Sequence, residues 1–216
     1  MEHKPYGPYE RYFKRPLDIL LSGLALIILS PLLLATAILV RIKLGSPIIF
    51  RQERPGKDGK IFVLHKFRSM TDGRNENGDL LPDDQRLTGF GKVLRSMSID
   101  ELPELWDVFR GKMSIVGPRP LLVEYLPFYT REERHRHDVR PGLTGLAQIN
   151  GRNTLTWEQK FTYDLKYVRH ISFAMDAGIV LSTVGKVLKR SDVQVNTQNS
   201  EGNLAKIRSC VGRSME

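Results

Sequence analysis

The stretch LLSGLALIILSPLLLATAILV (residues 20–40) has no charged side chain and contains the pair Ser30-Pro31 near its middle. From Leu17 the apolar run covers about 24 residues, roughly 36 Å as a straight helix, which is long enough to cross a bilayer. Hydropathy alone therefore favours a single-pass anchor. Because proline removes a backbone donor and clashes with the preceding turn, we expect a kink at Pro31.

The residues around this break favour a different topology. Ser30 can donate to a carbonyl that the proline leaves free, which allows a broken helix to persist in lipid. Basic residues flank both ends, with Lys14 and Arg15 before the run and Arg41 and Lys43 after it. Because positive residues are retained on the cytoplasmic side, these flanks favour a re-entrant hairpin with both ends in the cytoplasm. The residues by themselves leave both topologies open.

Composition limits the partners. Lys and Arg number 33 against 24 Asp and Glu, a formal net charge of +9, which suits nucleic acid, anionic lipid or a phosphorylated substrate. Aromatic residues are few and do not alternate with basic ones, and no zinc-ligand or helix-turn-helix pattern is present, so we expect no nucleic-acid partner. Cys210 is the only cysteine, which excludes an intrachain disulfide and indicates a reducing compartment.

The rest of the chain predicts an α+β fold that is mainly helical. Alternating runs at residues 48–53 and 60–70, around PGKDG, predict a small β-hairpin. A polar surface loop should follow at 71–86, then short helices at 89–97 and 99–110, a charged helix in TREERHRH, and a long loop at 139–153. A helix capped by Thr156 should cover 156–169. The amphipathic stretch 173–190 is either a core-facing helix or one at the headgroup level. The polar tail, 191–216, should be loosely ordered.

The segment SIDELPELWDVFRGKMSIVGPRP (residues 98–120) carries the most chemistry. One interpretation is structural: Ser98 and Glu101 match a capping box at a helix start. The other is functional, because adjacent carboxylates can hold Mg²⁺ together with phosphate oxygens, and basic side chains neutralise a transferring phosphoryl group. The pattern alone supports both interpretations.

Four ordered features resemble the bacterial sugar transferase family, in the form of the small monotopic phosphoglycosyl transferases. They are the Ser-Pro-broken apolar helix, QERPGKDGKIFVLHKFRSM, SIDELPELWDVFRGKMSIVGPRP and RPGLTGLAQINGR. The resemblance implies transfer of a sugar-1-phosphate from a UDP-sugar to polyprenyl (undecaprenyl) phosphate, giving UMP and requiring Mg²⁺. The VEYLPFY and NGRN segments look most like members that use N-acetylated amino or diamino sugars.

The resemblance also assigns the site residues. Asp100 would be the nucleophile on the sugar-linked phosphate, forming a covalent aspartyl phosphosugar, and Glu101 would help it bind Mg²⁺ and the diphosphate. The basic residues implied in substrate binding are Lys66, Arg68, Arg95, Arg119 and Arg152. A variant in which the acceptor phosphate attacks directly, with Asp100 as metal ligand, stays open.

The resemblance implies an organisation as well. Residues 1–45 would form the re-entrant membrane anchor broken at Ser30-Pro31, 46–190 the cytoplasmic catalytic domain and 191–216 a polar tail. The protein would lie on the cytoplasmic face of the bacterial inner membrane, in contact with its lipid, and could form a homo-oligomer. The alternative from another functional class is a single-pass anchored basic protein that binds anionic lipid or a partner.

Overall fold

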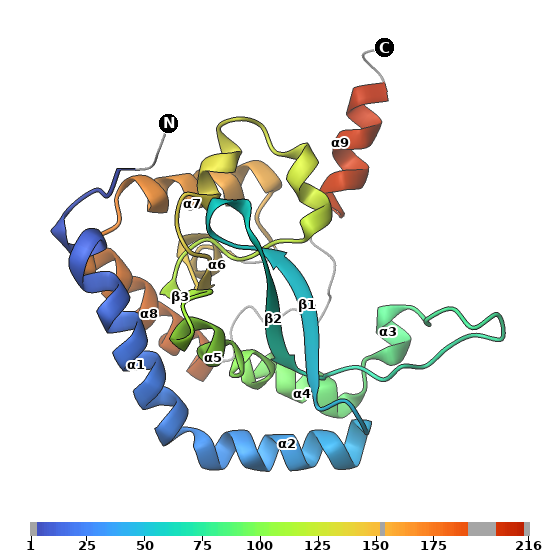
Figure 1. The fold of residues 1–216 in the computed structure, drawn as a ribbon. Helices are drawn as coiled ribbons and strands as arrows, with labels where there is room; N and C mark the ends of the chain where they lie inside the picture. The colour runs from blue at the N-terminus through green and yellow to red at the C-terminus, as the bar shows by residue number, and fades with distance from the viewer. Residues whose placement is uncertain (1–3, 152–153, 190–201, 214–216) are drawn as a thin grey trace.

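The computed structural model describes residues 4–151, 154–189 and 202–213 and confirms a mainly helical chain with small sheets (Figure 1). The helical elements are η1 (Tyr9–Phe13), α1 (Lys14–Ile28), α2 (Ser30–Leu44), η2 (Lys57–Gly59), α3 (Asp83–Arg86), α4 (Gly89–Ser96), η3 (Ile99–Glu101), α5 (Glu104–Phe109), η4 (Val123–Phe128), η5 (Glu133–His137), α6 (Leu146–Ile149), α7 (Trp157–Arg169), α8 (Phe173–Lys189) and α9 (Leu204–Arg213). The strands are β1 (Ile49–Pro55), β2 (Ile61–Phe67), β3 (Ser114–Val116) and β4 (Gly142–Thr144).

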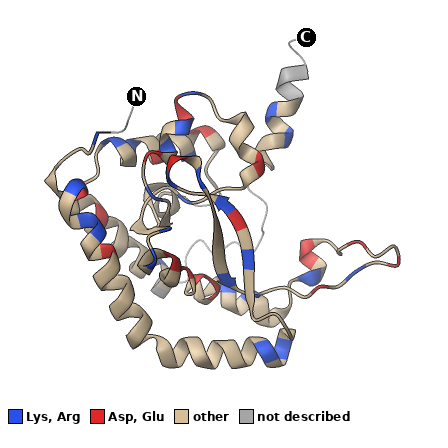
Figure 2. Cartoon of the chain, in the orientation of Figure 1, with Lys and Arg blue, Asp and Glu red and all other residues tan. Residues whose placement is uncertain are grey.

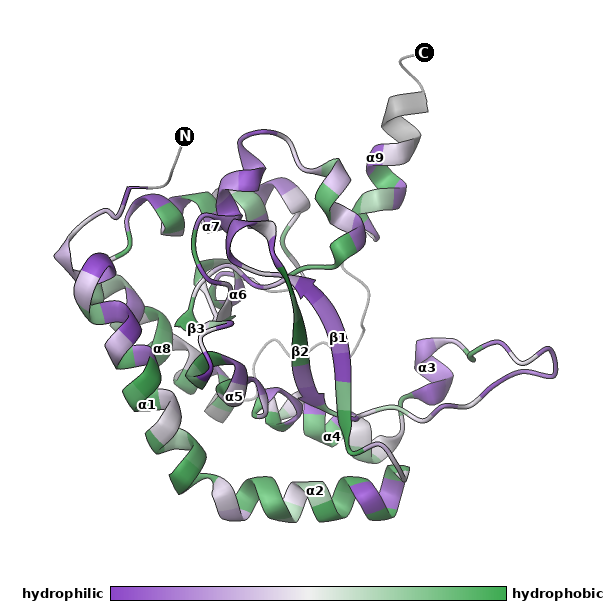
Figure 3. Cartoon of the chain, viewed as in Figure 1, coloured by the Kyte–Doolittle hydropathy of each residue, from purple (hydrophilic) through white to green (hydrophobic). Residues whose placement is uncertain are grey.

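The apolar stretch breaks where the sequence predicts. The helical pair Tyr9–Ile28 and Ser30–Leu44 is bent by 63°, and Ser30 Oγ donates to the Ile27 carbonyl at 2.7 Å. In the described part of the chain no single helix is long and apolar enough to cross a membrane, whereas this bent pair passes that test by length and composition. The pair could therefore be a broken span or a re-entrant loop. Figure 3 shows how apolar both of its helices are.

Most of the other elements lie inside the angle that α1 and α2 form, whereas α3 and its loop project beyond the end of α2 (Figure 1). Val40 and Leu44 of α2 pack with Leu94 of α4 and Phe67 of β2. On the α1 side, the buried Asp18 accepts hydrogen bonds from the Ser114 hydroxyl and a backbone amide of β3. Because α1 and α2 each bury one face against the elements between them, these contacts hold the angle between the two helices. The elements between them form the body of the protein, which carries most of the charged residues. Figure 2 shows no charged residue from the second half of α1 through most of α2; basic residues appear only at the end of α2.

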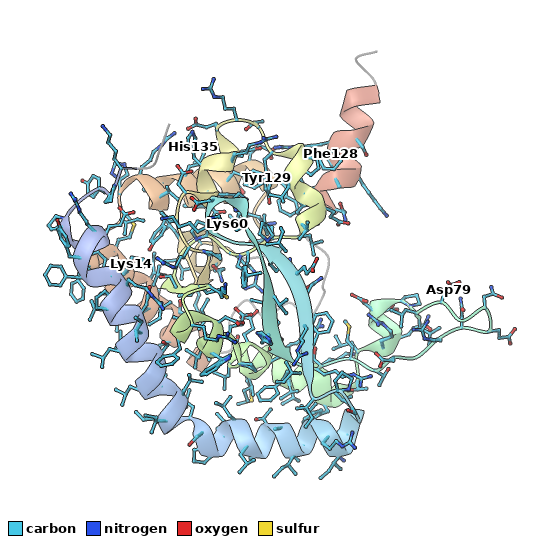
Figure 4. All side chains as sticks on the ribbon, viewed as in Figure 1. Lys14, Lys60, Asp79, Phe128, Tyr129 and His135 are labelled. Carbon is cyan, nitrogen blue, oxygen red and sulfur yellow. The ribbon has the colours of Figure 1, made fainter. Side chains whose placement is uncertain are left out.

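The predicted hairpin is confirmed as the antiparallel pair β1–β2, with Ile49 opposite Phe67 and Pro55 opposite Ile61. The predicted surface loop extends from the body, with Asp79 near its tip (Figure 4), and also contains the short helix α3. The prediction that residues 139–153 form only a loop is wrong, since this region supplies β4 and α6. The parallel pair β3–β4 joins it to the segment before GPRP.

The pairing of β3 with β4 depends on glycine. A Cβ on Gly142 would lie 2.1 Å from the backbone nitrogen of Gly117, so neither chain can carry a side chain where they meet. The helix capped by Thr156 is confirmed as α7. α8 buries Ile179 in a core with Tyr167 and Val168, as a core-facing helix should.

Two further expectations concern α8 and the C-terminal tail. Val184 of α8 is half exposed and Leu181 is 73% exposed, so the alternative of a helix at the headgroup level stays open. A loosely ordered tail is wrong for Leu204–Arg213. α9 forms there because Leu204 packs against Tyr125 and Trp157, an apolar contact that the polar composition of the tail does not reveal.

Candidate active site

The acid pair lies on a tight turn between α4 and α5. Ser98 has a left-handed backbone (φ 54°), and the single 3₁₀ turn η3 then presents Asp100 and Glu101 just before Pro103, the N-cap residue of α5. The predicted capping box is wrong, because Ser98 in this conformation makes no side-chain cap and Glu101 points elsewhere. A left-handed serine costs on the order of 1 kcal/mol, which the packing around the turn must offset.

Glu101 is ion-paired with two basic side chains. Lys66 Nζ from β2 and Arg119 Nη2 from the PRP segment each donate to its Oε1 at 2.7 Å. Burial alone would raise the pKa of Glu101, but Arg119 and Lys66 outweigh it and hold that pKa far below its usual range. Glu101 is therefore ionised at any physiological pH.

Asp100 differs from its neighbour. It is 9% exposed, and its carboxylate accepts no hydrogen bond from any residue in the described ranges. Burial, and then Glu101, raise its pKa, while the positive charges of Lys66, Arg95 and Arg119 oppose the rise. The result is a carboxylate without a protein partner, surrounded by cations. Such a group remains available to a ligand.

A third acid, Glu104, belongs to the same cluster and was missed in the sequence. It is 3% exposed, and its Oε1 lies 3.1 Å from Lys66 Nζ. Burial, opposed by Lys66, raises its pKa to about 7. The i, i+3 spacing from Glu101 was the signal that could have placed both acids on one side of the helix start.

Arg119 owes its position to a second arginine. Arg136 Nη2 donates to the Arg119 carbonyl at 2.7 Å, and its guanidinium is bound to Asp164 of α7 through Nε and Nη2 at 3.0 and 2.8 Å. The side chains of Arg136 and Asp164 are 2% and 5% exposed, whereas that of Arg119 is 45% exposed. A buried ion pair thus anchors the backbone of an arginine whose own head faces solvent.

The other predicted basic residues lie at different distances from the acids. Arg95 is close enough to oppose the rise in the pKa of Asp100, and its Nε donates to Ser69 Oγ at 2.9 Å. Arg68 is not brought to the acid pair: its guanidinium binds the carbonyls of Ser46 and Met70 and the carboxylate of Asp72. Arg152 lies outside the described residues.

The acid pair alone offers Mg²⁺ few protein ligands, so a bound ion would take its other ligands from substrate phosphate and water. No group of three or more metal-binding side chains occurs within the described residues. Within the acid pair, the Asp100 carboxylate and Glu101 Oε2 have no bonded partner among the described residues and could hold a cation. This donor set fits an ion that takes one or two carboxylates and completes its shell with phosphate oxygens and water.

The sequence of this chain is similar to those of known sugar transferases. The sequence profile of the bacterial sugar transferase family matches residues 9–190. The uncharacterized sugar transferase EpsL of Bacillus subtilis is 51% identical over 181 residues, which are 84% of this chain and 90% of EpsL. The UDP-glucose:undecaprenyl-phosphate glucose-1-phosphate transferase of Klebsiella pneumoniae is 44% identical over 84% of this chain and 41% of its own length.

A third relative acts on another sugar. The UDP-N-acetylgalactosamine-undecaprenyl-phosphate N-acetylgalactosaminephosphotransferase of Aeromonas hydrophila is 36% identical over 84% of this chain. The chain spans less than half the length of that relative and of the Klebsiella relative. The profile match covers the bent helix pair, the acid pair and the arginine-anchored PRP segment alike. This chain belongs to the bacterial sugar transferase family.

Proposed function

We propose that this protein is a phosphoglycosyl transferase that moves a sugar-1-phosphate from a UDP-sugar to polyprenyl (undecaprenyl) phosphate. The observation that carries the proposal is the unpartnered, nearly buried carboxylate of Asp100 among Lys66, Arg95 and Arg119. A site built only for stability would pair such a carboxylate. Here the neighbouring Glu101 binds Lys66 and Arg119, and Asp100 stays free to react.

The reaction proceeds in two displacements at phosphorus. A carboxylate oxygen of Asp100 attacks the sugar-linked phosphorus, the bond from that phosphorus to the UMP oxygen breaks, and UMP leaves with the electron pair. A phosphate oxygen of the polyprenyl acceptor then attacks the same phosphorus. The acyl-phosphate bond breaks, the polyprenyl-diphosphate sugar forms, and the Asp100 carboxylate is regenerated.

The basic residues stabilise the charge that moves between these groups. Arg119 and Lys66 are held against Glu101, and the exposed guanidinium of Arg119 can turn a further N–H toward a diphosphate. Arg95 adds positive charge from α4. Because these cations are fixed before substrate arrives, the site loses little free energy to reorganisation during the reaction.

Mg²⁺ is the proposed cofactor. Asp100 and Glu101 Oε2 would hold it, and when bound it would neutralise part of the negative charge on the donor diphosphate.

The bent helix pair is proposed to enter and leave one leaflet, on the cytoplasmic face of the bacterial inner membrane. Its outer face exposes large apolar side chains, including Leu24, Ile27, Leu34 and Ile42. The body occupies the inside of the angle, so a shallow wedge would hold the acids where a water-soluble donor meets a lipid-borne acceptor. This arrangement gives one chain access to both substrates.

Cysteine labelling tests that topology. Lys4→Cys and Lys43→Cys, each in a Cys210→Ser background, place a thiol before or after the apolar pair. We expect an impermeant maleimide added to intact cells to label neither position. Labelling of position 4 alone would instead support a single-pass anchor.

The acid assignment is tested by UMP release. With UDP-sugar, polyprenyl phosphate and Mg²⁺, Asp100→Asn should lower the rate at least a thousandfold, on the order expected when a nucleophile is removed. Asp58→Asn is the matched control, because Asp58 lies in the hairpin turn in a left-handed conformation that asparagine also adopts. A near-normal rate for Asp100→Asn would exclude the nucleophile role.

Trapping separates the two mechanisms. A labelled donor without acceptor should leave phosphosugar on the wild-type protein and none on Asp100→Asn. Turnover without any trapped adduct would favour direct attack by the acceptor. The same assay with a panel of UDP-sugars tests the donor, for which we propose an N-acetylated amino or diamino sugar over glucose.

A further inference from the structure

A groove lies where the chain leaves α2 and enters β1. It encloses about 630 Å³ and is lined by Arg41 together with residues 46–51. None of these residues belongs to the acid cluster. Arg41 is in the last turn of α2, and Arg51 is in β1.

The two arginines are exposed and unpaired. Within residues 4–151, 154–189 and 202–213, neither guanidinium has an ion pair or a hydrogen-bond partner. By contrast, Arg68, Arg119 and Arg136 are all bonded to carboxylates. Two free cations that line one groove form a site for an anion.

Apart from Ser46, the rest of the groove is apolar, and this apolar surface continues onto α2. Phe50 is 47% exposed beside Ile48 and Ile49. On α2, Ile38, one turn before Arg41, and Ile42, directly after it, are also exposed. An occupant that satisfies both parts has a phosphate head and a hydrocarbon chain.

The groove is held in shape by a residue of the KFRSM motif. Arg68 Nη1 donates to the Ser46 carbonyl at 2.6 Å, and the Arg68 backbone nitrogen donates to the Ile48 carbonyl at 2.9 Å. Phe50 is the cross-strand partner of Lys66, which holds Glu101. The groove is therefore rigidly connected to the strand that serves the acid pair.

We propose that this groove binds an anionic phospholipid of the surrounding membrane, with its phosphate between Arg41 and Arg51 and an acyl chain along Phe50 and α2. The proposal rests on the membrane placement in the proposed function. The polyprenyl acceptor has the same phosphate-on-hydrocarbon chemistry. We assign the groove to phospholipid because an acceptor phosphate must reach Asp100, whose cations Lys66 and Arg119 line no part of it.

Native mass spectrometry of the full-length protein in detergent tests the site, with phosphatidylglycerol and phosphatidylcholine as probes. The wild type should retain phosphatidylglycerol in preference to phosphatidylcholine. Arg41→Gln with Arg51→Gln should weaken phosphatidylglycerol binding about 30-fold, since two basic contacts to an anionic headgroup are lost. Arg41→Lys with Arg51→Lys should keep the preference, because the charge remains.

The matched control removes the same charge elsewhere. Lys57 and Lys60 are exposed at the hairpin turn, and Figure 4 shows Lys60 at the opposite end of the hairpin from α2. Lys57→Gln with Lys60→Gln should bind phosphatidylglycerol as the wild type does. Equal binding by the groove variant and this control would overturn the proposal.

Two further outcomes would separate the lipid site from an acceptor site and from the proposed enzymatic function. If polyprenyl phosphate displaces phosphatidylglycerol, and the glutamine groove variant raises the KM for acceptor with kcat unchanged, the groove holds the acceptor and the phospholipid proposal is overturned. If the wild type binds phosphatidylglycerol selectively but releases no UMP from any UDP-sugar, the lipid site stands and the proposed enzymatic function fails.

Discussion

The buried pair of Arg136 and Asp164 offers a direct test of how the site is held. Asp164→Asn keeps the shape of the side chain but removes its charge, leaving Arg136 inside the protein without a counterion. Both side chains are almost fully buried, and Tyr129 and Phe161 flank the guanidinium at 5.8 and 5.9 Å from their ring centroids. Loss of one partner of a buried ion pair costs about 3–5 kcal/mol.

Thermal unfolding in detergent measures that cost. For a chain of this size each kcal/mol shifts Tm by about 2–4 °C, so Asp164→Asn should lower Tm by roughly 10 °C. Glu132→Gln is the matched control, because Glu132 pairs with Arg169 on the surface, with both side chains more than half exposed. Such a pair contributes less than about 1 kcal/mol. Equal shifts for the two variants would refute the reasoning.

A double variant separates stability from function. Arg136→Met with Asp164→Leu replaces the ion pair by apolar groups, which should recover most of the lost stability. It also removes the donor to the Arg119 carbonyl. UMP release should therefore stay well below the wild-type rate even though Tm returns. Recovery of both would show that Arg136 does not position Arg119.

Three further predictions concern buried polar groups. Burial lowers the pKa of His137 to about 4, below its unfolded value near 6.5, so the native state should lose up to about 3 kcal/mol as the pH falls from 6.5 to 4. His137→Gln should flatten that decline in urea titrations, and an unchanged slope would contradict it. Burial raises the pKa of Glu104 to about 7, so wild-type stability should instead fall as the pH rises from about 4.5 to 7. Glu104→Gln should gain stability relative to wild type at pH 8 and lose that advantage near pH 4.5, as read from Tm at each pH. Asp18→Leu leaves the Ser114 hydroxyl and a β3 amide without their buried acceptor and should cost about 2–4 kcal/mol by denaturant unfolding; a change below 1 kcal/mol would show that α1 is not tied to the body there.

Local chemistry explains which elements the sequence predicts. The hairpin follows from alternation around PGKDG, and α7 follows from the Thr156 cap, since both signals act within a few residues. The break at Ser30-Pro31 is equally local: the proline interrupts the ladder, and the serine bonds the carbonyl three residues earlier. No distant contact is needed to derive any of these features.

The missed elements depend on contacts between distant segments. β3 and β4 are three-residue strands with no alternation to detect, and they pair only because Gly117 and Gly142 allow two backbones to meet. The role of Arg136 is hidden in the segment TREERHRH, which the sequence predicts only as a charged helix. The capping box failed for a related reason: two cations from elsewhere in the chain bind Glu101 more strongly than a serine amide would.

The two acids of the pair are not interchangeable. Glu101 meets Lys66 and Arg119 with a single oxygen, and those cations are themselves fixed, Lys66 by Glu104 and Arg119 by the buried Arg136. A carboxylate held this firmly cannot act as a nucleophile without giving up two charge-assisted hydrogen bonds. Asp100 has none to give up and is nonetheless in the same positive field, which supports the proposal that Asp100 is the nucleophile.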